Sequence, residues 1–220
     1  MKMMMITLVI FFGCLLSGCS TESEADALTL MQEIKGRDDD GQRTPIYRVR
    51  IPDNWVRRDP LPTESLKDTT KALCEFLIYE PGESIRIAIH NFPSETMEQR
   101  IPPFAQVERW KQQFAALYSA ESSFEPQAFN GYSGQLFIGK GLLEGKESMV
   151  MGWALQVAPE HYRTLSSPEN ENNIPSFKQM RADVTIKASG PKAFMEKHEA
   201  KIRAFARSFE LIEEIPRLRS

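Results

Sequence analysis

The strongest constraint on the fold is a set of segments in which apolar and polar residues alternate. In the segment 46–51, Tyr47, Val49 and Ile51 alternate with two arginines, the period-two pattern of a strand with one wet face. Similar strand-like patterns recur at 72–79, 84–91, 149–157 and 182–188. The links 80–83 and Gly145-Lys146 have turn-type composition, which predicts one hairpin over 72–91 and a second, longer one over 131–158.

Two segments change to the period of a helix. The first, PPFAQVERWKQQFAALYSA, starts with two prolines of the kind a first helical turn tolerates. Its apolar stripe recurs every three or four residues at Phe104, Val107, Trp110, Phe114 and Leu117. The second follows Ser189-Gly190-Pro191 and has one face made of Phe194, His198, Ile202, Phe205 and Phe209. Antiparallel strands with two long helices predict a single α+β domain, an antiparallel sheet flanked by helices.

The first residues have the features of a targeting signal. Lys2 gives a positive start, residues 6–16 are apolar, and Ser17-Gly18 supply the small residues of a cleavage site. The apolar run has about 11 residues, whereas a membrane-spanning helix needs about 20. The segment therefore predicts export rather than a retained transmembrane helix.

The end of this signal, Leu16-Ser17-Gly18-Cys19, resembles the bacterial lipobox. That resemblance implies that Cys19 is acylated and becomes the first residue of the mature chain, which anchors the protein to a membrane. Ser20 and Thr21 follow, a pair typical of the outer-membrane type rather than the inner-membrane type. The alternative is a plain secretory signal with an incidental cysteine.

Composition divides the chain into four parts. Residues 1–18 are the predicted signal peptide, and 19–44 are poor in apolar residues, which predicts a lipidated, flexible tether with one weak helical turn around 28–34. Residues 45–212 form the predicted domain, and 213–220 a C-terminal tail. Within the domain SSPENENNIPS, residues 166–176, is a loop by composition.

Charge and cysteine content exclude some classes of function. The chain has 27 Lys and Arg against 30 Asp and Glu, and removing residues 1–18 takes away Lys2 alone, which leaves 26 against 30, a net charge of −4. A chain with this slightly negative net charge lacks the excess of basic residues that is typical of nucleic-acid-binding proteins. With Cys14 removed and Cys19 lipidated, Cys74 has no internal disulfide partner, and its apolar surroundings predict a buried thiol.

The order of elements resembles the PsbP-like fold. The features that carry the resemblance are Ile51-Pro52 followed by Trp55, the helix with Trp110, a hairpin that opens at Gly131-Tyr132, and a closing strand and helix that end in Ser208-Phe209-Glu210. The resemblance covers about residues 46–212 and implies an α-β-α sandwich, of the kind found in a photosystem II extrinsic subunit and in bacterial envelope lipoproteins. It also implies a binding or assembly module without catalysis.

A search for catalytic and metal-binding motifs gives no candidate. His90, His161 and His198 are far apart in sequence, and none has a second ligand at metal-binding spacing. We therefore predict no catalytic residues, no metal and no cofactor. A site built from distant carboxylates such as Glu75, Glu80 and Glu83 leaves no local signature and stays open.

Two segments are candidates for binding a partner. The segment DNWVRRDPLP places Trp55 beside Arg57 and Arg58, residue types enriched at interface hot spots, although Trp55 as a plug of the sheet edge is an alternative. The connection from Asn91 to Pro103 is the second candidate. The predicted function is a lipid-anchored, non-catalytic interaction or assembly module that binds an envelope protein. The alternative is a carrier or sensor that holds an apolar ligand or lipid between the sheet and the helix with Trp110 and Phe114.

Overall fold

The computed structural model describes residues 29–37, 44–61, 68–94, 99–158, 162–164, 182–212 and 215–217. The longer strands are β1 (Leu30–Lys35), β2 (Pro45–Ile51), β4 (Cys74–Glu80), β5 (Glu83–Phe92), β7 (Ser123–Phe129), β8 (Tyr132–Leu143), β9 (Lys146–Val157) and β11 (Asp183–Pro191). The short ones are β3 (Val56–Arg58), β6 (Ala116–Leu117), β10 (Tyr162–Thr164), β12 (Glu210–Leu211) and β13 (Ile215–Arg217). The helices are α1 (Pro103–Lys111) and α3 (Lys192–Arg207), with a 3-10 turn at Ser119–Glu121.

Eight strands form the main sheet, in the order β3-β4-β5-β11-β9-β8-β6, with β7 also paired to β8. All of these pairings are antiparallel. The two predicted hairpins are confirmed as β4-β5 and β8-β9. The second turns through Glu144 and Gly145, both with positive φ, as a two-residue turn that matches strand twist requires.

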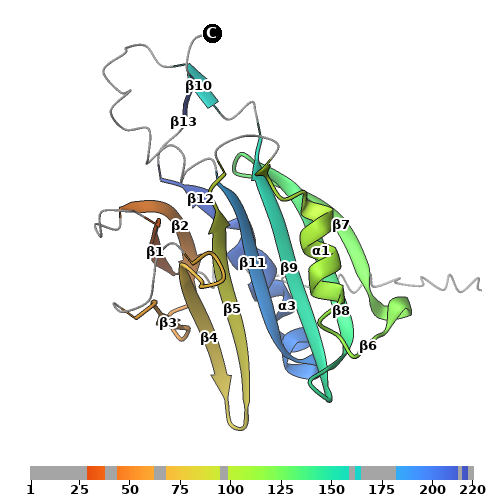
Figure 1. Ribbon diagram of the computed structural model, residues 1–220. Coiled ribbons are helices and arrows are strands. Elements are labelled where there is room, and N and C mark those ends of the chain that lie inside the picture. Colours follow the sequence, from red (N-terminus) through yellow and green to blue (C-terminus); the bar gives the residue numbers. More distant parts are fainter. Residues whose placement is uncertain are drawn as a thin grey trace, which may run out of the picture.

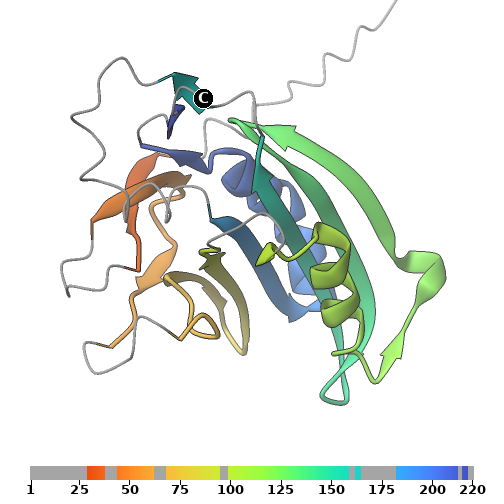
Figure 2. The same cartoon turned by 45° about the horizontal axis from the view of Figure 1, so that its top comes forward.

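The sheet has a helix on each face, which confirms the predicted fold class of an antiparallel sheet flanked by helices. In Figure 1, α1 lies in front of β8 and β9 while α3 lies behind the sheet, and Figure 2 shows the same two layers from a tilted view. Strand β9 is buried on both sides: Met151 and Trp153 pack toward α3, and Val150 and Ala154 pack toward α1. The α3 side holds the larger apolar cluster.

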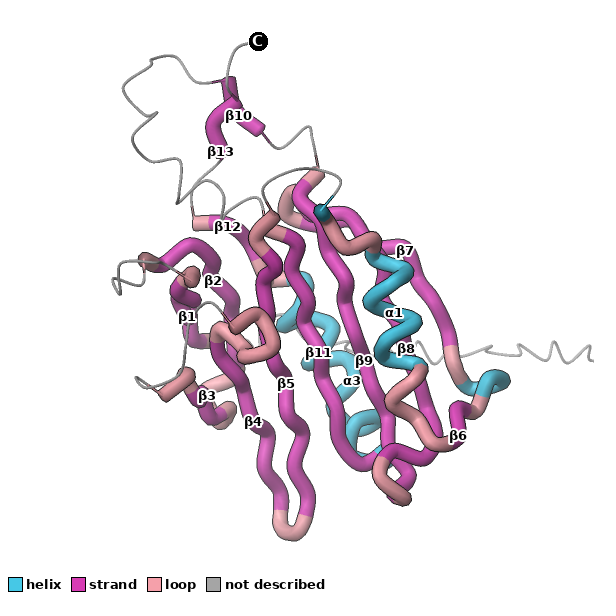
Figure 3. Tube along the Cα trace, viewed as in Figure 1, coloured by secondary structure: helices cyan, strands magenta, loops and turns pink. Residues whose placement is uncertain are grey.

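A second, three-stranded sheet of order β1-β2-β12 adds to the α3 side of the core (Figure 3). The ring of Tyr47 on β2 lies 4.8 Å from that of Phe209, which follows α3. Ile34 on β1 is fully buried in the same cluster. The prediction of a tether with a helical turn around 28–34 is therefore wrong at this point, because Leu30–Lys35 form a strand paired with β2.

The first helix is shorter than its apolar stripe. It ends at Lys111 instead of continuing to residue 120, because the chain turns back and pairs with β8: the Ala115 amide donates to the Leu142 carbonyl at 2.8 Å. Phe114 still packs on the sheet from the turn, whereas Phe104 is exposed. The stripe thus mixes residues of a helix, a turn and strand β6.

Before α1, a buried ion pair fixes the chain to the main sheet. The Arg100 guanidinium donates to Asp183 Oδ1 on β11, with Nε at 2.8 Å, and Gln156 on β9 donates to Asp183 Oδ2 at 3.2 Å. Both charged side chains are almost fully buried. Removal of one partner from such a pair leaves an uncompensated buried charge, so the contact holds the residues just before α1 on the sheet.

The remaining predictions on chain organisation concern the ends. Residues 1–28, with the signal and Cys19, and the predicted loop 166–176 lie outside the described residues. In the predicted tail, Ile215–Arg217 form β13, which pairs in parallel with β10. Neither described helix is long and apolar enough to cross a membrane.

Candidate binding face and pocket

Helix α1 covers only part of its side of the main sheet. It packs on β8 and β9, while no helix of the described residues lies over the same side of β3, β4, β5 and β11 (Figure 1). We call this region the open face and define it by Arg58, Glu75, Arg86 and Lys187. Strand alternation directs the apolar residues of these strands toward α3, so their polar residues lie on the open face.

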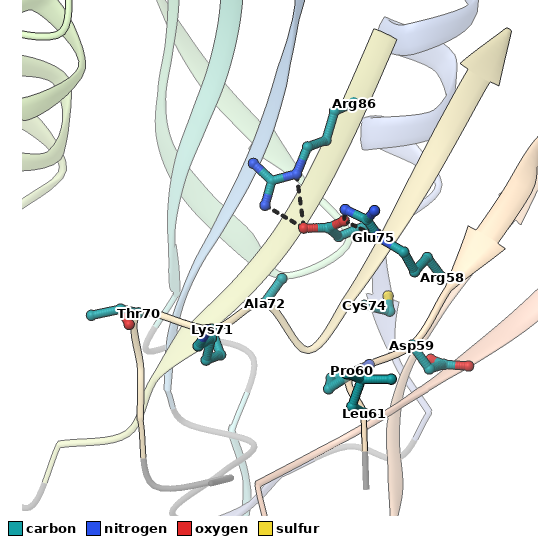
Figure 4. Close-up of a pocket in the computed structure, with 10 residues that line it drawn as sticks. All are labelled: Arg58, Asp59, Pro60, Leu61, Thr70, Lys71, Ala72, Cys74, Glu75 and Arg86. Atoms are coloured by element: carbon teal, nitrogen blue, oxygen red, sulfur yellow. Dashed lines mark hydrogen bonds and ion pairs between the residues drawn. The ribbon is translucent and has the colours of Figure 1, made fainter. Parts of the chain in front are cut away.

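The centre of the open face is a carboxylate held by two guanidinium groups. Arg58 Nε donates to Glu75 Oε2 at 2.7 Å, and Arg86 Nε donates to Glu75 Oε1 at 2.8 Å. The Nη2 group of each arginine contacts the same oxygen as its Nε (Figure 4). Glu75 is nearly buried, whereas the two arginine side chains are 60% and 50% exposed. The arrangement therefore presents two cations to solvent around one sequestered anion.

The sheet register explains why these groups meet. Arg58 on β3 lies directly opposite Glu75 on β4, which lies opposite Ala88 on β5, and Ala88 in turn lies opposite Lys187 on β11. Cross-strand neighbours on one face have Cβ atoms about 5 Å apart, so charges in such a row interact. Arg86 lies two residues before Ala88 on the same face of β5, and its guanidinium group reaches Glu75 diagonally across the two strands.

A pocket of about 490 Å³ lies at the β3-β4 end of the open face. Its wall includes Arg58, Glu75 and Arg86 on one side, and Pro60, Leu61 and Lys71 on the other (Figure 4). Two acidic residues, Asp59 and Glu75, also line it, but Asp59 already accepts from Arg57 Nε at 3.0 Å and Nη2 at 2.9 Å. The cations that remain give the pocket a positive character.

Burial and neighbouring charges shift the pKa values of two groups on the open face. Burial, and then the charge of Arg86, lower the pKa of Lys187 to about 8. Lys187 Nζ donates to Gln113 Oε1, a neutral acceptor in the turn after α1. The pKa of Glu75 is lowered by its hydrogen bonds to Arg86 and Arg58, against the opposing effect of burial, so its carboxylate stays ionised.

A half-buried histidine, His90, lies on the same side of β5, next to the buried Arg37. Burial is the main cause that lowers the pKa of His90 to about 4, and the charge of Arg37 adds to it. Arg37 Nε donates to Asn91 Oδ1 at 2.9 Å, and its Nη1 donates to the Asp68 carbonyl at 2.9 Å. These contacts tie the segment 68–71, at the edge of the pocket, to β5.

The three residues predicted to bind a partner lie in different environments in the structure. Trp55 is buried, and its ring centroid lies 5.3 Å from that of Phe205 on α3. Its side chain therefore packs in the core at the edge of the sheet, which is the alternative given for it above. Arg57 binds Asp59 and, with Nη1, the Glu33 carbonyl of β1 at 2.7 Å. Only Arg58 lies on the open face. Partner binding by this segment stays a prediction.

The other candidate groups do not gather into one site. Glu80 lies on the opposite side of β4 from Glu75 and pairs with Lys197 of α3 at 2.7 Å, so these two carboxylates cannot act together. Asn91 is the buried end of β5 rather than part of a loop, and 95–98 fall outside the described residues. Within the described ranges no three His, Cys, Asp or Glu residues are placed to hold a metal ion. The Cys74 thiol is buried, as predicted.

The predicted space for an apolar ligand between α1 and the sheet is filled. A Cβ atom added to Gly152 would lie within 3.0 Å of three atoms of the Trp110 ring, and one added to Gly139 would meet the rings of Phe137 and Phe114. The nearby hollow beside Gln106 measures about 10 Å³, near the lower limit for one water molecule. Trp110 and Phe114 thus pack as core.

Comparisons with protein families and with curated proteins find no match. Among solved structures, the chain is similar to LpqN, described as involved in cell envelope biogenesis of Mycobacterium tuberculosis, with a TM-score of 0.48, 11% identity, and 83% of this chain and 92% of that chain covered. It is also similar to the cyanobacterial PsbP (CyanoP) of Synechocystis sp. PCC 6803, with a TM-score of 0.41, 14% identity, and 84% and 93% covered.

Proposed function

We propose that this chain is an exported, lipid-anchored envelope protein whose α+β domain is a non-catalytic binding module. Its partner, an envelope component, contacts the open face. The observation that carries the proposal is the pair of solvent-exposed guanidinium groups of Arg58 and Arg86 beside a pocket on a sheet face that α1 does not cover.

The anchor and the start of the fold together limit where the module works. The lipobox Leu16-Ser17-Gly18-Cys19 supports acylation of Cys19, and Ser20 supports the outer membrane. Because β1 begins at Leu30, only residues 20–29 link the anchor to the domain. A fully extended chain spans at most about 3.6 Å per residue, which gives a reach of about 40 Å. The domain therefore stays close to the membrane surface.

The chemistry of the open face supports binding over catalysis. A general base needs a pKa near the working pH, but Glu75 is stabilised as the anion by two guanidinium groups, which makes it a weak base. Arginines stay protonated and recognise anionic groups through several directed N–H donors. The open face is thus suited to bind an anionic group rather than to catalyse proton transfer.

Site-specific photo-crosslinking in cells tests the proposal. A photoreactive residue at Tyr79, which is 57% exposed and continues the open face along β4, should give a discrete adduct with one envelope component. The same residue at Lys201, exposed on α3, is the matched control and should give none. Adducts of equal yield from both positions, or none from Tyr79, would contradict the open face as the contact site.

The anchor is tested separately. Changing Cys19→Ser should move the protein from the membrane fraction to the periplasmic fraction, as measured by fractionation and immunoblotting. Retention of the variant in the membrane would show that acylation of Cys19 is not what holds the protein there.

A further inference from the structure

The pocket on the open face combines three features of an anion-binding site. Its two arginines come from different strands and approach the same point, their side chains are about half exposed, and Lys71 contributes a further cation to the wall. With Asp59 held by Arg57, the two guanidinium groups of Arg58 and Arg86 face the single carboxylate of Glu75, an excess of one positive charge. This local excess of positive charge stands on a chain whose net charge is −3.

Both guanidinium groups keep donors for a second acceptor. Each has five N–H donors, and its contacts with Glu75 are made by Nε and Nη2. The Nη1 groups lie outside these contacts. Glu75 therefore orients the arginines without using all of their donors, and a fixed orientation lowers the cost of binding a ligand.

We propose that the pocket binds an oxyanion, a phosphate or carboxylate group carried by a larger ligand, through Arg58 and Arg86. The inference deepens the proposed function by naming the chemical group recognised at the same face. The volume of about 490 Å³ is within the range of small-molecule sites, so the pocket has room for more than the anion alone.

Two neighbours add to the assignment. Lys187 lies beside Arg86 with the neutral Gln113 as its side-chain partner, so a bound anion would also be attracted by its ammonium group. Pro60 and Leu61 form an apolar part of the wall, and Leu61 is 66% exposed. A ligand with an anionic head and an apolar neighbouring part matches this distribution.

Titration with inorganic phosphate tests the inference directly. The full-length lipidated protein in a neutral detergent is titrated by isothermal calorimetry, and the arginine variants R58Q and R86Q are compared with R48Q. Arg48 pairs with Glu210 on the other sheet, so this control has the same charge change outside the pocket. We expect R58Q and R86Q to weaken phosphate binding at least about tenfold, the loss of one charge-assisted contact, and R48Q to leave it nearly unchanged.

The substitution Glu75→Gln gives a change of opposite sign. It raises the charge of the cluster by one but keeps only one of the two acceptor oxygens that orient the arginines. We expect the added attraction for an anion to outweigh the lost contact, so phosphate should bind about threefold to tenfold more tightly. Thermal unfolding midpoints check that every variant is folded. No phosphate binding to the wild type, equal weakening in R48Q, or weaker binding in E75Q would each overturn the assignment.

Vesicles distinguish the source of the anion. This assay uses the full chain with Cys19→Ser, which lacks the acyl anchor. Binding of that protein to phosphatidylglycerol vesicles but not to phosphatidylcholine vesicles, lost when R58Q or R86Q is added, identifies a lipid headgroup. Phosphate binding without vesicle binding identifies a soluble or protein-borne group. If phosphate binding fails while the Tyr79 crosslink persists, the inference is wrong and the proposed function stands. If phosphate binds to the pocket while the Tyr79 crosslink is absent, the oxyanion site is supported and the proposed function is wrong.

Discussion

Gly152 shows how one missing side chain positions α1. It lies on β9 under the Trp110 ring, where an added methyl group would overlap three ring atoms. We predict that Gly152→Ala lowers the free energy of unfolding by about 1–3 kcal/mol, the usual cost of overpacking a core. Urea denaturation measures this. In a Trp110→Ala background the ring is gone, so the same change should cost much less. Equal costs in both backgrounds would contradict the packing described.

His90 makes stability depend on pH in a window of its own. Its pKa falls from 6.5 to about 4 in the folded protein, so the unfolded chain binds the proton more readily between these values. Stability is therefore lost as the pH falls, by about 2 kcal/mol between pH 7 and pH 5. Glu75 adds its loss only below its ordinary pKa of 4.5. Urea titrations at both pH values should show a smaller loss in His90→Gln, and an unchanged loss would contradict the assignment.

The contribution of strand β1 to stability shows whether the folded domain begins before residue 45. Ile34 is fully buried, whereas Met31 on the same strand is 48% exposed. We predict that Ile34→Ala costs about 2–4 kcal/mol of unfolding free energy, because it leaves a cavity in the core. Met31→Ala is the matched control and should stay within about 0.5 kcal/mol. Thermal and urea unfolding of both variants give the comparison, and similar effects would mean that β1 adds little to the domain.

The elements predicted correctly from the sequence are those with strong local periodicity. Strands β5, β9 and β11 alternate over many residues, β4 is a mostly apolar run, and the turn residues that join β4 to β5 and β8 to β9 are local signals as well. Strand β1 was missed because its segment LMQEIK has one deeply buried residue and gains its burial from β2. The end of α1 was missed because the apolar spacing continues through Phe114 and Leu117. What ends the helix is a distant strand, β8.

The candidate site was predictable only in part, because it too depends on contacts between strands that are far apart in the sequence. Alternation places Arg86 and His90 on the polar side of β5, and Arg58 was singled out for its residue type. That Arg58, Glu75 and Lys187 lie in one row depends on the strand order β3-β4-β5-β11, which joins segments more than a hundred residues apart. Trp55 has the composition of an interface anchor, yet its burial follows from the position of Phe205 on α3.

At the scale of the whole molecule, the main sheet has an apolar cluster on each face, and its central strands belong to both clusters. On β8, Leu136 packs toward α3 and Phe137 toward α1, and neighbours on β9 do the same. Loosening either helix therefore exposes strands that also support the other helix. This sharing favours a single cooperative unfolding unit over two independent ones.

The three tryptophans report on both sides of the sheet. Trp55 and Trp153 lie in the α3 cluster and Trp110 in the α1 cluster. In variants that keep one tryptophan each, with phenylalanine at the other two positions, we predict that the fluorescence transition in urea has the same midpoint as the circular dichroism of that variant. Trp110 is the critical probe, because α1 is only nine residues long. A Trp110 transition at lower urea than the loss of strand signal would show that α1 leaves the sheet before the sheet unfolds.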